Sequence, residues 1–237
     1  MNKRIRSLYL SYTFNRGNLA ILLISLILIA VVLNLFDFDI SNFDYQEDII
    51  YYHKDYLRYA INLTLPIAIV VIVSILAIDY SVNQKKFDLL FVTKVESKDL
   101  LKIKIYVYLL LSFFYLSLIY ILIMFTGFLR FKYFSFDVDI LKIYFMMIFM
   151  GIEASILSMI IIRLTRIGYS SILIFILYFV GRIVTDIEER IGNIIFLNID
   201  LNNMISPLGI LPSCAIIVAE ILILRFAFAK SEIKIKK

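Results

Sequence analysis

The chain of 237 residues is 62% hydrophobic and only 18% charged, whereas soluble domains are about 45–50% apolar and about 25% charged. This composition excludes an ordinary soluble protein and predicts a single membrane domain over residues 1–237, because the apolar runs leave too little polar sequence for a second domain. The net charge of +5 does not indicate nucleic-acid binding, because the lysines and arginines are concentrated in alternate loops.

The N-terminal region has the pattern of an amphipathic helix over residues 3–15. Ile5, Leu8, Tyr9 and Tyr12 recur at helical spacing, and basic and polar residues occupy another face. The basic face suits the anionic head groups of membrane lipids, so we expect a helix lying at the membrane interface. A frayed N-terminus is the alternative, because so short a helix is only marginally stable alone.

Six segments are apolar enough to span a bilayer, for which about 20 residues are needed. The first five are residues 19–36, 59–78, 105–128, 143–162 and 167–184, and the sixth follows Pro207 and Pro212 and ends near residue 229. Residues 37–58 are acidic and rich in tyrosine, which is typical of an outer loop. Residues 186–204 are too polar to span but place isoleucines on one helical face, which predicts a short helix on the outer leaflet.

The positive charges predict the orientation of these spans. Of the 24 lysines and arginines, 17 fall on the side of the membrane that holds both termini and 7 on the other. Because cytoplasmic loops are enriched in lysine and arginine, we expect both termini to be cytoplasmic. The sequence therefore predicts an all-α, multi-pass protein of the cell membrane with six transmembrane helices.

The sequence gives no indication that the chain is an enzyme. No glycine begins the G-x-x-x-x-G-K-[ST] loop that binds nucleotide phosphates, so nucleotide-driven work would need another chain. The only histidine, His53, and the only cysteine, Cys214, cannot supply the paired groups of a catalytic site. Acidic residues lie near His53 without a known ligand spacing, so we expect no metal site and no cofactor in this chain.

Three residues inside the predicted spans are candidates for a substrate path. Glu153 and Glu220 lie near the middle of the fourth and sixth spans, where an ionised side chain costs about 2.5–3.5 kcal/mol or more. Each is either a polar spot that could meet a cationic cargo or a subunit, or a protonated side chain that donates a hydrogen bond to a neighbouring helix. Pro66, in the second span, predicts a hinge or cavity lining, or is simply tolerated there.

The longest polar segment between two spans is residues 79–104, which we call the coupling segment. It carries an apolar patch between lysines, formed by Phe87, Leu89, Leu90, Phe91 and Val92. Ser97 is suited to cap a helix that begins at Lys98, and Asp99 in its first turn favours the helix dipole. This helix would lead directly into the third span, so that a push on the patch would move the span as a rigid body.

The coupling segment resembles the cytoplasmic coupling helix of the membrane subunits of ABC-2 type transporters. That helix carries an acidic residue, two leucines, T-P-V-S-R, an apolar pair and G-K, and the matching residues here are Asp88, Leu89, Leu90, Thr93, Val95, Asp99, Leu100, Leu101 and Lys104. The residues that depart from the pattern are Lys94, Glu96, Ser97 and Ile103. The amphipathic N-terminus, the turn at 163–166, the outer segment before the last span and Ser206-Pro207 are also similar to that family.

The resemblance implies that the chain is the permease half of an ABC exporter. A separate ABC ATPase subunit, which binds ATP and Mg²⁺, would dock on Phe87, Asp88, Leu89, Leu90, Phe91, Thr93 and Asp99. A second permease subunit, either a copy or a relative, would complete the path.

The phenylalanine-rich interior favours an amphiphilic or hydrophobic cargo, such as a peptide, a toxin or a drug. The alternative is a membrane protein that transports nothing and either binds a peptide toxin to confer immunity or scaffolds an assembly. Such a protein would use the outer loops at 37–58 and 186–204.

Overall fold

The computed structural model describes residues 10, 13–35, 46–91, 97–134, 138–176, 215 and 217–226. Over these residues the chain is helical and contains no strand. Four helices are long and apolar enough to cross a membrane: α2 (Arg16–Leu35), α3 (Gln46–Phe91), α4 (Ser97–Phe131) and α5 (Val138–Thr165). They confirm the prediction of an all-helical membrane protein. Together they contain the first four predicted spans, apart from Phe36, the last residue of the first span.

The remaining predicted elements are described only in part. The fifth span begins as the short 3₁₀ helix η1 (Gly168–Ser171) and continues as α-helix over 172–176. The sixth span is represented by a helical segment over 217–226. Arg182, the outer segment at 186–204 and most of the N-terminal amphipathic segment lie outside the described residues.

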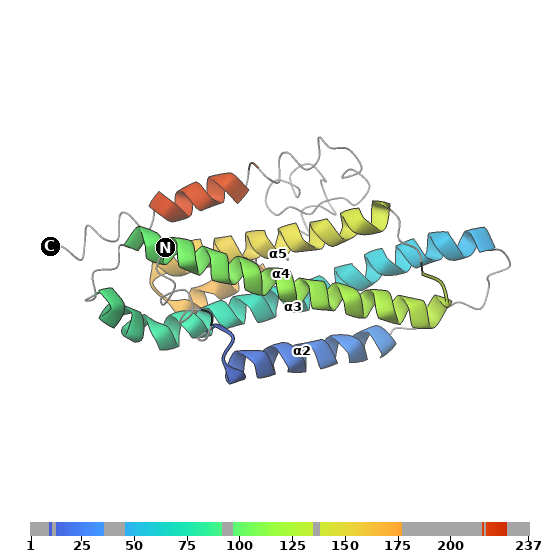
Figure 1. Cartoon of the computed structure of the whole chain (residues 1–237), viewed down its shortest axis with the longest axis horizontal. Coiled ribbons are helices and arrows are strands. Elements are labelled where there is room, and N and C mark those ends of the chain that lie inside the picture. Colours follow the sequence, from blue (N-terminus) through green and yellow to red (C-terminus); the bar gives the residue numbers. More distant parts are fainter. Residues whose placement is uncertain are drawn as a thin grey trace.

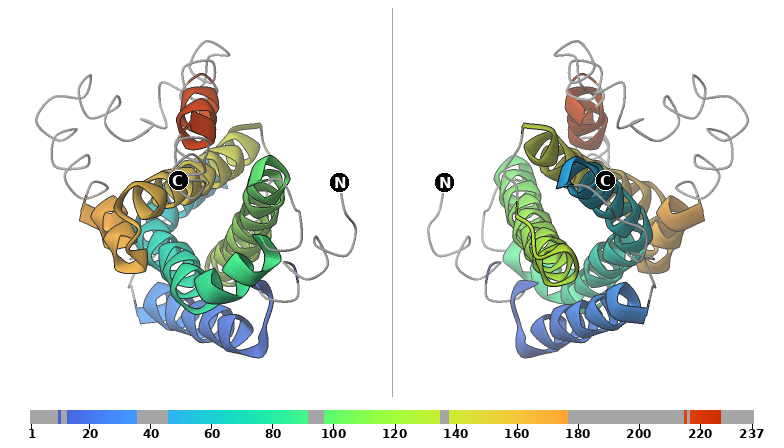
Figure 2. Two further views of the ribbon diagram at one scale, coloured as in Figure 1. Left: turned by 90° about the vertical axis from the view of Figure 1, so that its left-hand side faces the viewer. Right: turned by 90° about the vertical axis from the view of Figure 1, so that its right-hand side faces the viewer.

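The helices form an elongated bundle in which α3, α4 and α5 all contact one another (Figure 1). The peripheral helix α2 packs against α3 and α4, whereas the helix at 217–226 lies on the opposite side of the bundle (Figures 1 and 2). The end of α3 and the start of α4 lie at the same end of the bundle, on the left in Figure 1. We call this the coupling end, because the coupling segment is there.

Polar contacts join the apolar helices at several points inside the bundle. The hydroxyls of Ser112 on α4 and Ser155 on α5 are 2.7 Å apart, and those of Ser25 on α2 and Tyr115 on α4 are 2.6 Å apart. In a bilayer, close packing and such hydrogen bonds hold helices together, because lipid tails are as apolar as the side chains. The large apolar side chains exposed along α2 are accordingly suited to face lipid.

The helices α4 and α5 pack closely at Gly151 on α5. A Cβ atom built there would lie 2.1 Å from Cδ1 of Leu116 on α4, whose side chain is fully buried. Only a residue without a side chain allows this separation, as small residues do in many membrane helix interfaces.

The loop that we expected over residues 37–58 is replaced in part by helix, because α3 begins at Gln46. Residues 46–58 form the first turns of α3, and several of their side chains are integrated into the bundle. His53, Tyr56 and Leu57 are 0%, 3% and 0% exposed, and they continue the buried face of the helix beyond the apolar run. With 46 residues, α3 is about 70 Å long at 1.5 Å per residue, so it extends beyond a hydrocarbon core of about 30 Å.

The expected turn over residues 163–166 is also shorter than predicted, because α5 continues to Thr165. Arg166 alone adopts the left-handed conformation, with φ of 62°, and its N–H donates to the carbonyl of Ile162 at 2.8 Å. Lys132 ends α4 in the same way, with φ of 53° and a 2.8 Å hydrogen bond to Phe128. Both residues occupy the C-terminal capping position that glycine usually takes.

Candidate functional site

The coupling segment is largely built from extensions of two membrane helices. The last turns of α3 contain Phe87, Asp88, Leu89, Leu90 and Phe91, and Asp99 lies in the first turn of α4. The helix that starts here and runs without interruption into the third span is confirmed, although it starts at Ser97 and not at Lys98. Thr93 lies outside the described residues.

A cluster of charged and polar side chains lies where the coupling segment enters the bundle. The carboxylate of Asp79 on α3 is buried, with the residue 2% exposed, and it accepts a hydrogen bond from the hydroxyl of Tyr108 on α4. Asp79 and Tyr108 line a cavity of about 40 Å³ together with Lys104 of α4 and Arg163 of α5. We call these four residues the polar junction.

The polar junction connects all three central helices with one acidic and two basic side chains. Opposite charges and a phenol donor are the partners that make a buried carboxylate tolerable. Sequence reasoning missed this junction because it treated Asp79 and Lys104 as the two ends of a loop. The available signal was the spacing of Lys104 and Tyr108, which are four residues apart and therefore share a helix face.

The two glutamates inside the predicted spans are both buried. Glu153 on α5 is 3% exposed and Glu220 on the 217–226 helix is 6% exposed. The Oε2 atom of Glu220 has no hydrogen-bond partner among the described residues. We call Glu153 and Glu220 the glutamate pair.

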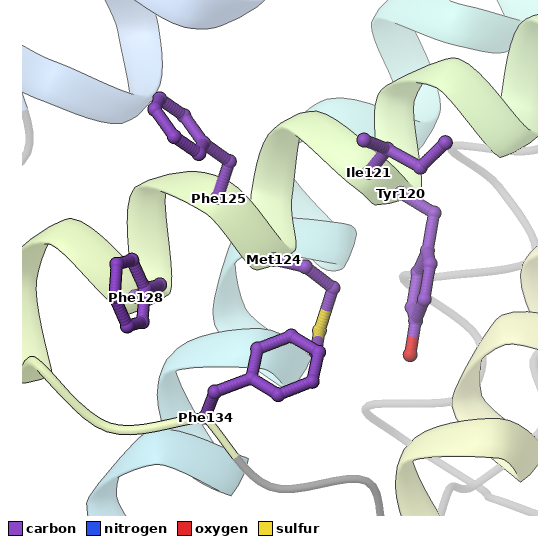
Figure 3. Close-up of a pocket in the computed structure, with 6 residues that line it drawn as sticks. All are labelled: Tyr120, Ile121, Met124, Phe125, Phe128 and Phe134. Atoms are coloured by element: carbon purple, nitrogen blue, oxygen red, sulfur yellow. The ribbon is translucent and has the colours of Figure 1, made fainter.

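An apolar cavity lies along the C-terminal half of α4. It has a volume of about 490 Å³ and is lined by Tyr120, Ile121, Met124, Phe125, Phe128 and Phe134 (Figure 3). The hydroxyl of Tyr120 donates a hydrogen bond to the carbonyl of Ile140 at 2.9 Å, so this polar group already has a partner. We call this cavity the aromatic pocket; its volume is within the range of about 300–1,000 Å³ that is usual for small-molecule sites.

The lining of the aromatic pocket was not identified from the sequence, which indicated only an interior rich in phenylalanine. Five of the six residues follow helical spacing on α4, and Phe134 comes from the segment after it. Figure 3 shows the Phe134 ring beside the Met124 side chain. The position of Phe134 in the pocket depends on how the chain turns at Lys132, and the composition of the sequence does not reveal that turn.

Pro66 lies within α3, which continues through it as one helix. It lines a second cavity of about 440 Å³ together with residues of α2 and α3 and with Phe175. Because proline has no N–H, the carbonyl of Asn62 loses its usual donor within the helix. The structure therefore places Pro66 at a cavity that is separate from the glutamate pair.

His53 is completely buried near the start of α3. Its ring meets Phe131 and Tyr133 edge-on at centroid distances of 5.7 and 5.9 Å, and neither ring nitrogen has a hydrogen-bond partner within the described ranges. No group of three or more potential metal ligands occurs in the part of the chain that the structure describes. His53 is thus a packing residue within an aromatic cluster.

Comparison of the chain with protein-family models, curated protein sequences and solved structures gave no significant match. The ABC-2 resemblance therefore rests on the residues of the coupling segment and on the arrangement of the predicted spans.

Proposed function

We propose that this chain is the membrane-spanning subunit of an ABC exporter of the ABC-2 type. It moves an amphiphilic or hydrophobic substrate out of the cell, using ATP hydrolysed by a separate ATPase subunit. The observation that supports this most strongly is the continuity of the coupling segment with the membrane helices. The apolar patch is carried by α3 up to Phe91, and α4 starts at Ser97 and runs through the predicted third span.

This continuity gives the patch a mechanical role. A helix resists bending, so a displacement of the end of α3 or the start of α4 moves the part inside the membrane. The polar junction extends the movement to α5, because Arg163 lines the same cavity as Asp79 and Lys104. An ATPase that binds the patch would thereby act on three membrane helices.

The ATPase cycle would drive transport by changing which conformation is favoured. ATP and Mg²⁺ would bind the ATPase subunits, and their association would move two permease subunits between inward-facing and outward-facing states. A partner shifts such an equilibrium only by the difference between its affinities for the two states. The second permease subunit, a copy or a relative, would complete the path.

The aromatic pocket supports an apolar component in the cargo. Its described lining offers carbon and sulfur atoms, and its one hydroxyl is already bonded to the backbone. Such a cavity favours a hydrocarbon or an aromatic ring over a sugar, whose hydroxyls would lose their hydrogen bonds there. An amphiphilic peptide, toxin or drug meets this requirement.

A resistance assay separates the exporter from a toxin-binding protein. Cells would carry the chain alone, the chain with a candidate ABC ATPase from its native genome, or the chain with that ATPase lacking its phosphate-loop lysine. Challenge with a panel of amphiphilic peptides and drugs should reveal resistance only with the active ATPase. Equal resistance from the chain alone would contradict the exporter and favour the toxin-binding protein.

A further inference from the structure

We propose that the polar junction binds an anionic phosphate group. This goes beyond the exporter proposal, because it requires neither an ATPase nor a cargo. The first observation is the depth of the junction in the membrane. Asp79 directly follows the second predicted span, Lys104 directly precedes the third, and Arg163 directly follows the fourth. Each charge therefore marks the end of an apolar run, where the hydrocarbon core of a bilayer gives way to the lipid headgroups.

The second observation is the cavity between these side chains. Its volume of about 40 Å³ exceeds the roughly 10–15 Å³ that one water molecule needs, so it has room for a small polar group but not for a lipid chain. Leu76 and Met159 line the same cavity, and they precede Asp79 and Arg163 by about one helical turn. The cavity thus has charged walls at the membrane boundary and apolar walls on the side toward the hydrocarbon core.

The third observation is an excess of hydrogen-bond donors and of positive charge in the cavity lining. A lysine ammonium has three N–H donors and an arginine guanidinium has five, whereas a carboxylate accepts at about four lone-pair positions. Asp79 already uses one of these positions for the hydroxyl of Tyr108. Donors of Lys104 and Arg163 therefore remain even when Asp79 is fully occupied, and two positive charges face one negative charge. Such a lining is complementary to an anion with several acceptor oxygens, and phosphate is such an anion.

The location of the polar junction identifies the headgroup of an anionic membrane lipid as the source of the phosphate. Basic pockets between transmembrane helices bind the headgroups of anionic lipids. Here α3, α4 and α5 all contribute to the pocket, and Lys104 and Arg163 are only half-buried, so their charges can be reached from outside. A bound phosphate would join α4 to α5 beside the hydrogen bond that joins α3 to α4.

The test measures lipid binding to the purified full-length chain in a neutral detergent by native mass spectrometry. Phosphatidylglycerol is the anionic probe, and phosphatidylcholine with the same acyl chains is the zwitterionic control. We expect saturable binding of phosphatidylglycerol that is at least about tenfold tighter than that of phosphatidylcholine. The affinity should fall at least about tenfold when Lys104→Gln and Arg163→Gln are combined, because the charge-assisted hydrogen bonds to the phosphate are lost.

Two further variants separate the site from a general attraction to basic residues. Lys102→Gln combined with Arg225→Gln removes one lysine and one arginine that are exposed and lie outside the described lining of the cavity. This control variant should leave the affinity unchanged. Asp79→Asn should tighten binding of phosphatidylglycerol, because it removes the negative charge from the lining while its amide oxygen can still accept the hydrogen bond from Tyr108.

The proposal is overturned if phosphatidylglycerol binds no more tightly than phosphatidylcholine, or if the Lys104 and Arg163 double variant loses no more affinity than the control variant. The cavity then holds only water. Circular dichroism shows whether each variant is folded. If the double variant is unfolded, Lys104→Gln alone must weaken binding and Asp79→Asn must tighten it; shifts in the same direction, or no shift, would also overturn the site.

Inorganic phosphate distinguishes a lipid headgroup from a free anion. Displacement of phosphatidylglycerol only by a large excess of inorganic phosphate supports the lipid as the source. Inorganic phosphate that binds as tightly as the lipid, and is lost in the Lys104 and Arg163 double variant, would overturn the lipid assignment and give the site to free phosphate.

Discussion

The hydroxyl of Tyr108 on α4 donates a hydrogen bond to Oδ2 of Asp79 on α3, where the aspartate is almost completely buried. This bond joins the two helices at the base of the coupling segment, one helix leading into the segment and the other leading out of it. The two helices are therefore joined by this side-chain hydrogen bond as well as by the chain that links them. Movement of either helix at this level must carry the other or break the bond.

Replacement of Tyr108 by Phe should destabilise the protein by about 1–3 kcal/mol, because a buried carboxylate loses its phenol donor. The measurement is the free energy of unfolding in detergent by denaturant titration. Tyr169→Phe is the matched control, because Tyr169 is 77% exposed and its hydroxyl can bind water. Equal stabilities of the two variants would show that the Asp79 contact contributes nothing.

Replacement of Gly151 by Ala should destabilise the contact between α4 and α5 by about 1–3 kcal/mol, the usual cost of overpacking a core. The new methyl group would lie 2.1 Å from Leu116 Cδ1, which cannot withdraw because its side chain is fully buried. Gly17→Ala is the control, since its Cβ would meet only Asn15 Oδ1 at 3.3 Å.

Combining Gly151→Ala with Leu116→Ala tests the cause of this effect. The second substitution removes the clashing atom, so the double variant should lose less stability than the two single variants together. Additive losses would refute the steric explanation.

The hydroxyl pair of Ser112 and Ser155 should contribute about 0.6 kcal/mol, the average for polar contacts between membrane helices, and at most about 1.7 kcal/mol. The two single alanine variants and the double variant form a thermodynamic cycle that isolates this term. Ser155 also donates to the carbonyl of Gly151 at 2.7 Å, so Ser155→Ala should cost more than Ser112→Ala. A coupling energy of zero would mean that the 2.7 Å contact between α4 and α5 is not a stabilising hydrogen bond.

Glycine at position 132 should stabilise the protein relative to alanine by about 1 kcal/mol, because φ of 53° is strained for a residue with a Cβ. Comparing Lys132→Gly with Lys132→Ala removes the charge in both and leaves only the backbone effect. At Thr165, the last residue of α5, Thr165→Ala should be more stable than Thr165→Gly, because glycine destabilises a helix. The melting temperatures of these two variants and the two Lys132 variants test this. A preference for the same residue at both positions would contradict the capping assignment.

The apolar runs of the sequence predicted the membrane parts of α2, α3, α4 and α5, because about 20 apolar residues suffice to identify a span. The ends of these helices were harder to predict. Residues 46–58 have the composition of an outer loop, yet His53, Tyr56 and Leu57 are buried by neighbouring helices. This burial depends on tertiary contacts that local composition does not encode.

The candidate sites were predictable to different degrees. Glu153 and Glu220 could be identified individually, because a charged residue inside an apolar run is costly. The burial of each one could not be predicted, since it depends on how the helices pack. The same applies to the Asp79 contact, which joins residues of two helices separated by the coupling segment.

The most direct test of the central claim is co-purification of an ABC ATPase with the chain from its native membrane. We expect the ATPase to be recovered with the wild type and lost when Phe87, Leu90 and Phe91 are all replaced by Asp. The control replaces Leu164, Ile167 and Tyr169 by Asp, which adds the same charge to exposed side chains at the same end of the bundle. This control should retain the ATPase. Recovery of the ATPase with the Phe87, Leu90 and Phe91 variant, or its absence from the wild type, would contradict the account.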